Sequence, residues 1–239
     1  MFEHYCEKII DILNCIKNSQ AEKIMQAGQM VAETIENDGI VYIFGCGHSH
    51  LIGLDCFYRA GGLANVSAML DTDLMLHNGA AKSSKMEKMS GISESIFERY
   101  CITKKDILII VSTSGKNAVP CEMAMVATKN GIPTISVVSS AYFEDKTDTK
   151  KLYECCDLYL DNCVPHGDAV MDITGTTVKM GSVSTVSSSF IVQSLLLEAA
   201  EIAAKHGGEV PIYKSGNVDG GADFNKALIA KYLPRIKHL

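Results

Sequence analysis

Residues 106–117 read DILIIVSTSGKN, and this stretch decides the fold of the chain. After Asp106 the run is apolar and rich in isoleucine with no alternation, which is typical of a strand buried on both faces of a parallel sheet. Small polar residues follow it, and Val119–Lys129 then predicts a helix, with Pro120 in the first turn where proline is tolerated. A strand, a polar loop and a helix in this order predict a βα unit.

The same order recurs on both sides of this unit. The fold we expect is α/β: a single doubly wound, flavodoxin-like parallel sheet of about five strands flanked by helices. Two helices over residues 2–36 form a helical extension, 1–38, which belongs to the same domain as the remainder, 39–239. We predict further strands at 40–44, 65–69, 133–138 and 158–160, helices at 50–60, 94–100, 183–205 and 224–236, and a long loop at 71–90.

Composition limits the possible partners. The chain has 239 residues and a formal net charge of −6, which argues against binding nucleic acid or an anionic membrane. The acidic, periodic N-terminus is not a signal peptide, and no apolar run reaches the ~20 residues of a membrane span. The nine cysteines are odd in number and form no Cys-x-x-Cys pair, so we expect buried thiols, a reducing compartment and a cytoplasmic protein.

Two loops follow predicted strands, and both should lie at the carboxyl edge of the sheet, where ligands bind in such folds. The first is Gly45–Ser49 (GCGHS), whose glycines let backbone approach a ligand. The second, Ser112–Asn117 (STSGKN), carries three hydroxyls that can donate hydrogen bonds to a phosphate, beside the N-terminus of a helix. The alternative is an ordinary helix cap and turn. The patterns of a P-loop and of a dinucleotide fingerprint are absent.

GCGHS followed by DILIIVSTSGKNAVP resembles the pair of motifs in sugar isomerase (SIS) domain proteins. These include phosphoheptose isomerase, other aldose–ketose phosphosugar isomerases and N-acetylmuramic acid 6-phosphate etherase. The likeness covers about residues 20–206. It implies a sugar-phosphate site without cofactor, in which the following residues bind the phosphate: Ser49, Ser112, Thr113, Ser114, Gly115 and Asn117.

Further segments resemble particular members of this family. GCGHSHLIGLDCFYRAGG and TGTTVKMG (174–181) are similar to the etherase, whereas the size and HGDA (166–169) are closer to SIS proteins often labelled phosphoheptose isomerases. GSVSTVSSS (181–189) resembles the helix start that closes the sugar site of glucosamine-6-phosphate synthase. Two registers are therefore open for the third ligand-contacting segment, and we prefer Ser184 and Thr185. We also expect Gly47 and Asp168 to contact the sugar.

The sequence departs from the family at Arg59, where the isomerase and the etherase carry a catalytic Glu. An arginine cannot act as a general base, but its guanidinium fits an anionic group of the substrate, so Arg59 is a candidate sugar-binding residue. Isomerisation needs a base for the proton beside the carbonyl. The candidates for this acid–base chemistry are His48, Glu87 and His166, with Glu94 and His50 as alternatives. A metal site built from His48, His50, His166 and Asp168 is the less favoured interpretation.

The function that we expect is isomerisation of a sugar phosphate, in the manner of phosphoheptose isomerase. The alternatives are a protein that binds and senses a sugar phosphate without chemistry, and an etherase or lyase acting on N-acetylmuramic acid 6-phosphate. The likeness to SIS proteins and the apolar N-terminal helices imply a homodimer or homotetramer that shares sites across an interface.

Overall fold

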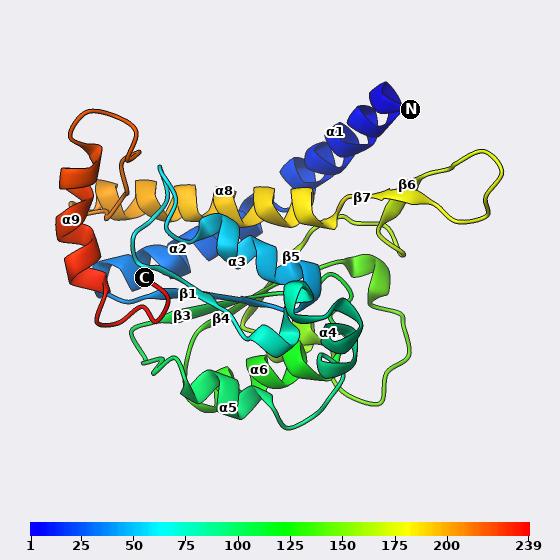
Figure 1. Ribbon diagram of the computed structural model, residues 1–239, viewed down its shortest axis with the longest axis horizontal. Helices are drawn as coiled ribbons and strands as arrows, with labels where there is room; N and C mark the ends of the chain where they lie inside the picture. Colours follow the sequence, from blue (N-terminus) through cyan, green and yellow to red (C-terminus); the bar gives the residue numbers. More distant parts are fainter.

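A five-stranded parallel sheet lies at the centre of the protein, in a computed structural model that describes residues 1–239 (Figure 1). The strand order is β2-β1-β3-β4-β5, and every neighbouring pair is parallel. This confirms the predicted α/β fold class and the position of each predicted strand. The strands are β1 (Val41–Gly45), β2 (Val66–Met69), β3 (Ile107–Val111), β4 (Thr134–Val138) and β5 (Leu158–Asp161).

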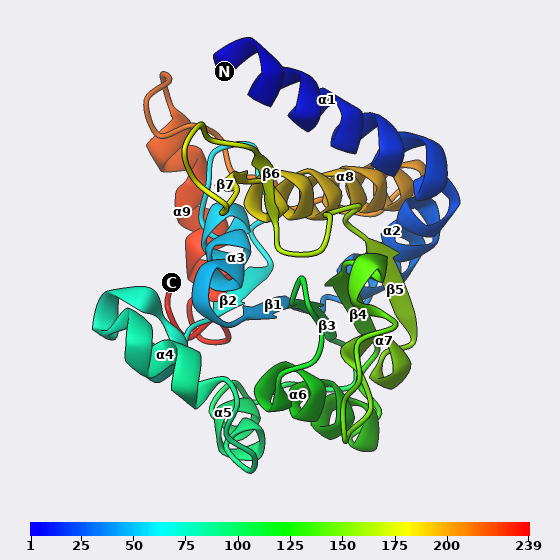
Figure 2. The same ribbon diagram turned by 90° about the vertical axis from the view of Figure 1, so that its right-hand side faces the viewer.

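Helices cover both faces of the sheet (Figure 2). On one face lie α1 (Phe2–Ser19), α2 (Ala21–Glu36), α3 (His50–Cys56) and α8 (Ser184–Lys205). On the other lie α4 (Ala80–Met86), α5 (Ser93–Glu98), α6 (Ala118–Lys129) and the short α7 (Leu152–Cys155), and α9 (Gly221–Tyr232) closes the end of the sheet where β1 and β3 begin.

The residues of β3 explain why this strand shows no alternation of polar and apolar residues. Ile107, Ile109 and Val111 belong to the apolar cluster under α2 and α8. Leu108 and Ile110 belong to the second cluster, under α5 and α6. Because helices bury both faces of the central strand, every position along it is apolar.

The α8 helix is long and apolar enough to cross a membrane by length and composition alone. Its buried residues, among them Ile191, Leu195 and Ala199, instead contact the sheet and α2 as part of the core. The two helices approach closely at Gly28, where an added Cβ would lie 2.7 Å from the Cβ of Glu198. This close packing makes α8 a core helix, within the predicted bounds 183–205.

Three predictions along the chain were wrong in their bounds. The last helix covers Gly221–Tyr232 rather than 224–236. The helix after β1 ends at Cys56 rather than at residue 60, because Tyr58 and Gly61 adopt positive φ values of 47° and 76° that a helix cannot contain. Residues 71–90 are not one long loop, since they form 3₁₀ turns at Thr72–Leu74 and Leu76–Asn78 and the helix α4. The Ser83 hydroxyl donates to the Leu74 carbonyl at 2.8 Å and holds these turns together.

The sequence did not predict a short antiparallel hairpin of β6 (Ala169–Met171) and β7 (Met180–Ser182). It projects from the start of α8 beside the N-terminal part of α1, and the Tyr5 hydroxyl donates to the Ser182 carbonyl at 2.7 Å. Further 3₁₀ turns cover Gly47–Ser49 and Ser140–Tyr142.

Candidate functional site

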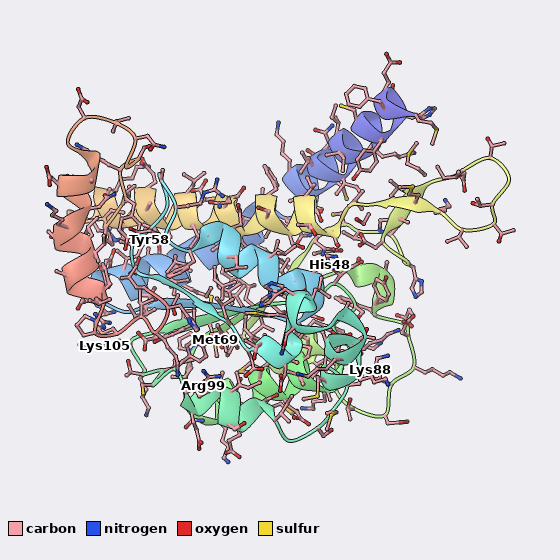
Figure 3. All side chains as sticks on the ribbon, viewed as in Figure 1. His48, Tyr58, Met69, Lys88, Arg99 and Lys105 are labelled. Carbon is pink, nitrogen blue, oxygen red and sulfur yellow. The ribbon has the colours of Figure 1, made fainter.

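A polar hollow lies at the carboxyl edge of the sheet. It is narrow, with about 10 Å³ open to the centre of a water-sized sphere. Three segments far apart in the sequence meet here: the loop after β1, the loop after β3 and the first turns of α8. In Figure 3 His48 marks this edge, where α8 begins. The residues around the hollow are His48, Ser49, Ile52, Val111, Thr113, Ser184, Thr185 and Ser188.

The loop after β1 turns back sharply onto its own strand. A Cβ on Gly45 would lie 2.6 Å from the backbone of Ser49, so only glycine allows this turn. Gly47 has φ +56°, in the left-handed region that favours glycine. The buried His50 ring contacts the Gly47 carbonyl through Nδ1, and burial lowers the pKa of His50. The turn places Ser49 at the hollow, half-buried, with His48 exposed at its rim.

The loop after β3 is fixed by backbone hydrogen bonds that leave its side chains available. The Gly115 carbonyl accepts from the Leu152 N–H at 2.8 Å, and the Thr113 carbonyl accepts from the Ser139 N–H at 2.9 Å. Gly115 has φ +58°, which again favours glycine. Ser112, Thr113 and Ser114 are all half-buried, and Thr113 lines the hollow.

Helix capping does not account for this loop. Asn117 occupies the N-cap position of α6, yet its side chain makes no capping hydrogen bond. That side chain instead lies near the Glu87 carboxylate. At the start of α6 the Val119 N–H donates to the Glu87 carbonyl and Pro120 has no N–H, so this helix end offers an anion few free donors.

The third segment is the start of α8, in the register that we preferred. Ser184 and Thr185 lie at the hollow, whereas residues 174–181 lie in the β6–β7 hairpin, outside it. Asp168 holds this end of the helix: its carboxylate accepts from the Ser184 N–H at 2.8 Å and from the Ser184 hydroxyl at 2.8 Å. Asp168 thus positions Ser184 and is not itself among the residues that line the hollow.

Sequence reasoning missed Asn162 and Ser188. The fully buried Asn162 side chain donates to Ser188 Oγ at 3.1 Å and to Thr113 Oγ1 at 3.4 Å, which joins two sides of the hollow. The signal that could have identified Asn162 is its position just after β5, because polar residues at the carboxyl ends of parallel strands gather at one edge.

Glu87 lies at the C-terminal end of α4, beside the start of α6 that follows the loop after β3. Its carbonyl accepts from the Val119 N–H at 3.1 Å, in the first turn of α6. Burial raises the pKa of Glu87, and the nearby Asn117 amide and the charge of Lys88 oppose that rise. A half-buried carboxylate with a raised pKa at this edge has the properties of a proton-transfer group.

His166 belongs to a second polar cluster beside the loop. Its ring stacks on Tyr142 with centroids 4.4 Å apart, and its Nε2 lies 3.4 Å from the Asp145 carboxylate. Lys116 donates to the same carboxylate at 2.8 Å and lowers its pKa. Asp145 therefore links His166 to the loop that contains Lys116, although His166 is exposed and does not line the hollow.

The structure does not bring Arg59 to the hollow. The guanidinium pairs with Asp55 on α3 and lines a different depression, together with Tyr58 and Tyr213. Figure 3 places Tyr58, the neighbour of Arg59, well away from His48. Asp55 also accepts from Ser189 and Gln193 of α8, at 2.8 and 3.0 Å, and these hydrogen bonds fix α3 against α8.

Comparison with solved structures agrees with this architecture. Phosphoheptose isomerase from Neisseria gonorrhoeae superposes with a TM-score of 0.51 at 16% identity, over 83% of this chain and 97% of the other. A phosphoheptose isomerase from Francisella tularensis superposes with a TM-score of 0.53 at 15% identity, over 84% of this chain and 96% of the other. The Vibrio vulnificus NanR protein, solved in complex with ManNAc-6P, superposes with a TM-score of 0.50 at 14% identity, over 99% of this chain and 70% of the other. At these identities the likeness concerns the fold.

Sequence comparison is more specific. A UPF0309 protein from Caldanaerobacter subterraneus subsp. tengcongensis is 39% identical over 246 residues, covering 100% of both chains. A UPF0309 protein from Geobacillus thermodenitrificans is 37% identical over 240 residues, covering 99% of this chain and 96% of the relative. The family model described as SIS domain matches residues 4–139, which include both glycine-containing loops. The chain therefore belongs to the SIS domain family and, within it, to the UPF0309 proteins.

Proposed function

We propose that the hollow binds the phosphate of a sugar phosphate and that the protein isomerises the sugar. The observation that carries this proposal is the set of hydroxyls that meet there from three segments: Ser49 after β1, Thr113 after β3, and the serines and threonine in the first turns of α8. Donors of this kind, without a lysine or arginine in the lining, match a phosphate held by hydrogen bonds and the helix dipole.

The phosphate ligands in this proposal are Ser49, Ser112, Thr113, Ser114, Gly115 and Asn117. The hollow has about 10 Å³ open to the centre of a water-sized sphere, room for about one water molecule, so phosphate binding would require its side chains to move apart and would leave the sugar at the rim. There Gly47, Ser184 and Thr185 are the proposed sugar contacts, with Asp168 holding Ser184 in place.

Glu87 is the proposed base. In an aldose–ketose isomerisation it would take the proton from the carbon beside the carbonyl and return it to the neighbouring carbon, with no net change in charge. His48 at the rim and His166 beside Asp145 are the proposed groups for opening the ring and for protonating the enediolate oxygen. The protein is proposed to act in the cytoplasm as a homo-oligomer.

Arg59 favours a second candidate function, binding without turnover. It stands where related isomerases carry a catalytic Glu, and it pairs with Asp55 outside the hollow. In this case the phosphate site remains and only the acid–base step is absent. An etherase or lyase reaction would use the same hollow and the same acid–base candidates.

The experiment is a thermal-shift screen against sugar phosphates and their unphosphorylated forms. A ligand at about 100 times its Kd stabilises the folded state by about 2.7 kcal/mol, which is readily measured. We expect a phosphorylated sugar to raise the Tm of the wild type, and Ser114→Ala to abolish that rise. Ser95→Ala, an exposed serine on α5, serves as the matched control and should retain it.

Two negative outcomes of the screen distinguish the candidate functions. If no phosphorylated sugar changes the Tm, the loop at Ser112–Asn117 is only part of the scaffold. If a sugar phosphate binds and Ser114→Ala abolishes binding, but no isomer forms over prolonged incubation, the binding-only function holds. The ketose or aldose product is followed by NMR of the sugar carbons.

A further inference from the structure

Two thiols from distant parts of the chain lie side by side near the end of β5. Cys15 in α1 and Cys163, just after β5, have their sulfur atoms 2.8 Å apart, although 148 residues separate them. A disulfide has a bond of about 2.0 Å, so small rotations of two side chains would bring the atoms to bonding distance.

Contacts other than the thiols hold these two segments together. Gln20, at the junction of α1 and α2, accepts from the Asp161 N–H at 3.0 Å through its side-chain oxygen. The Asp161 carboxylate accepts in turn from the Cys163 N–H at 2.9 Å. Ser19 lies next to both thiols, with its hydroxyl 2.8 Å from the Cys15 carbonyl and 3.8 Å from the Cys163 sulfur. The proximity of the sulfurs therefore follows from the fold, and no bond between them is needed to maintain it.

No other cysteines are placed in this way. Three of the remaining seven, Cys46, Cys56 and Cys121, are buried within the core, where an oxidant has no access. Cys6 and Cys101 are exposed, Cys155 and Cys156 are half-buried, and none of these four has a thiol partner within hydrogen-bonding distance. Burial raises the pKa of Cys163 to about 12, so the exposed Cys15 is the sulfur that an oxidant reaches first.

We propose that Cys15 and Cys163 form a reversible intramolecular disulfide, with a small disulfide such as glutathione disulfide as the oxidant. The Cys15 thiolate attacks one sulfur of the oxidant, forms a mixed disulfide and expels one glutathione thiolate. The Cys163 sulfur then attacks Cys15, the mixed S–S bond breaks, and the second glutathione thiolate leaves and takes up the proton that Cys163 releases. Two protein thiols are oxidised and one glutathione disulfide is reduced to two glutathiones.

The cross-link would affect the geometry of the hollow through one residue, Asn162. Asn162 precedes Cys163 and joins Thr113 to Ser188 by its side chain. Joining Cys163 to α1 restrains this position, so oxidation should change the affinity for a sugar phosphate. This last step rests on the proposed function, whereas formation of the disulfide does not.

The test exposes the full-length wild type to glutathione buffers of increasing oxidising strength, blocks free thiols with an alkylating agent and digests with trypsin. We expect a disulfide between the peptides 9–17 and 152–179 and an intact mass lower by two hydrogen atoms. Fragmentation within the second peptide should assign the bond to Cys163 and not to Cys155 or Cys156. A reductant should restore the original mass.

Variants complete the test. Cys15→Ser and Cys163→Ser should each prevent the cross-link, and Cys6→Ser, the matched control on the same helix, should form it as the wild type does. The cross-linked form should melt at a higher temperature than the reduced form, since the bond closes a long loop in the unfolded chain. Circular dichroism checks that each variant is folded.

Three outcomes would overturn the proposal: glutathione retained separately on Cys15 and Cys163, a cross-link that survives in Cys163→Ser, or a Cys15-to-Cys15 dimer on a non-reducing gel. A cross-link that forms without any change in ligand affinity refutes only the coupling to the hollow. If the disulfide forms and no sugar phosphate binds in either state, the proposed function fails and the redox site stands.

Discussion

At the scale of single residues, the hollow depends on polar side chains that do not cap their own helix or turn but bond to residues far away in the sequence. Asn117 occupies the N-cap of α6 without capping it, and Asp168 caps α8 from outside that helix. Asn162 is fully buried, and its side-chain amide donates hydrogen bonds to two hydroxyls of the hollow. Such non-local hydrogen bonds fix the geometry of the site more tightly than a surface loop would by itself.

The first prediction at this scale concerns Glu87. Because burial raises its pKa above the ordinary 4.5, the folded state keeps this proton to a higher pH than the unfolded state does. The wild type should therefore lose stability as the pH rises from about 4.5 through the raised pKa. Glu87→Gln removes this loss, so the Tm difference between variant and wild type should be small near pH 4 and should grow toward pH 7.

The same variant tests the proposed base. Isomerisation should fall by about 100- to 10,000-fold in Glu87→Gln, while the Tm shift caused by the sugar phosphate remains. Glu94→Gln is the matched control, because Glu94 is an exposed carboxylate on α5 with only a loose contact to Lys129, at 3.8 Å. A Tm difference that does not vary with pH would contradict the raised pKa, and unchanged turnover would exclude Glu87 as the base.

At the scale of elements, the packing of α2 on α8 depends on one glycine. Gly28→Ala would gain about 1 kcal/mol of helix propensity if the site were exposed. Here the new methyl would lie 2.7 Å from the Cβ of Glu198, and relieving such overpacking typically costs about 1–3 kcal/mol. We therefore expect a net loss of stability, measured by urea unfolding.

Gln29→Ala provides the comparison for this prediction, since Gln29 is the exposed neighbour on the same helix. Its free energy of unfolding should stay within about 0.5 kcal/mol of the wild type. If Gly28→Ala proved more stable than the wild type, helix propensity would outweigh the contact and the close approach of α2 to α8 would not matter energetically.

At the scale of the whole molecule, the sheet joins two apolar clusters into one unit. Ile109 contributes to the cluster under α2 and α8, and its neighbour Ile110 to the cluster under α5 and α6. Ile109→Ala and Ile110→Ala should each lower the free energy of unfolding by about 2–5 kcal/mol. Both variants should unfold in one transition that circular dichroism and tyrosine fluorescence report at the same denaturant concentration. Two separate transitions would show that the faces unfold independently.

Much of the architecture was determined by the sequence alone. An unbroken apolar strand such as Ile107–Val111 requires cover on both faces, and its repetition between helical segments predicts a parallel sheet. The sequence did not predict the turns within 71–90 or the hairpin of β6 and β7. These depend on contacts such as that of Ser83 with Leu74 and on strand pairing, which no short sequence pattern encodes.

The sequence also identified the two loops that meet at the carboxyl edge, since strand ends in a parallel sheet lie together and small hydroxyl residues there have few structural uses. Only the tertiary structure decided which distant residues join them: Ser184 and Thr185 rather than residues 174–181, Asn162 and Ser188 in addition, and Arg59 apart. The physical reason is that side-chain proximity across a fold depends on the packing of whole elements, α8 over the sheet above all, and packing of that kind leaves no local trace in the chain.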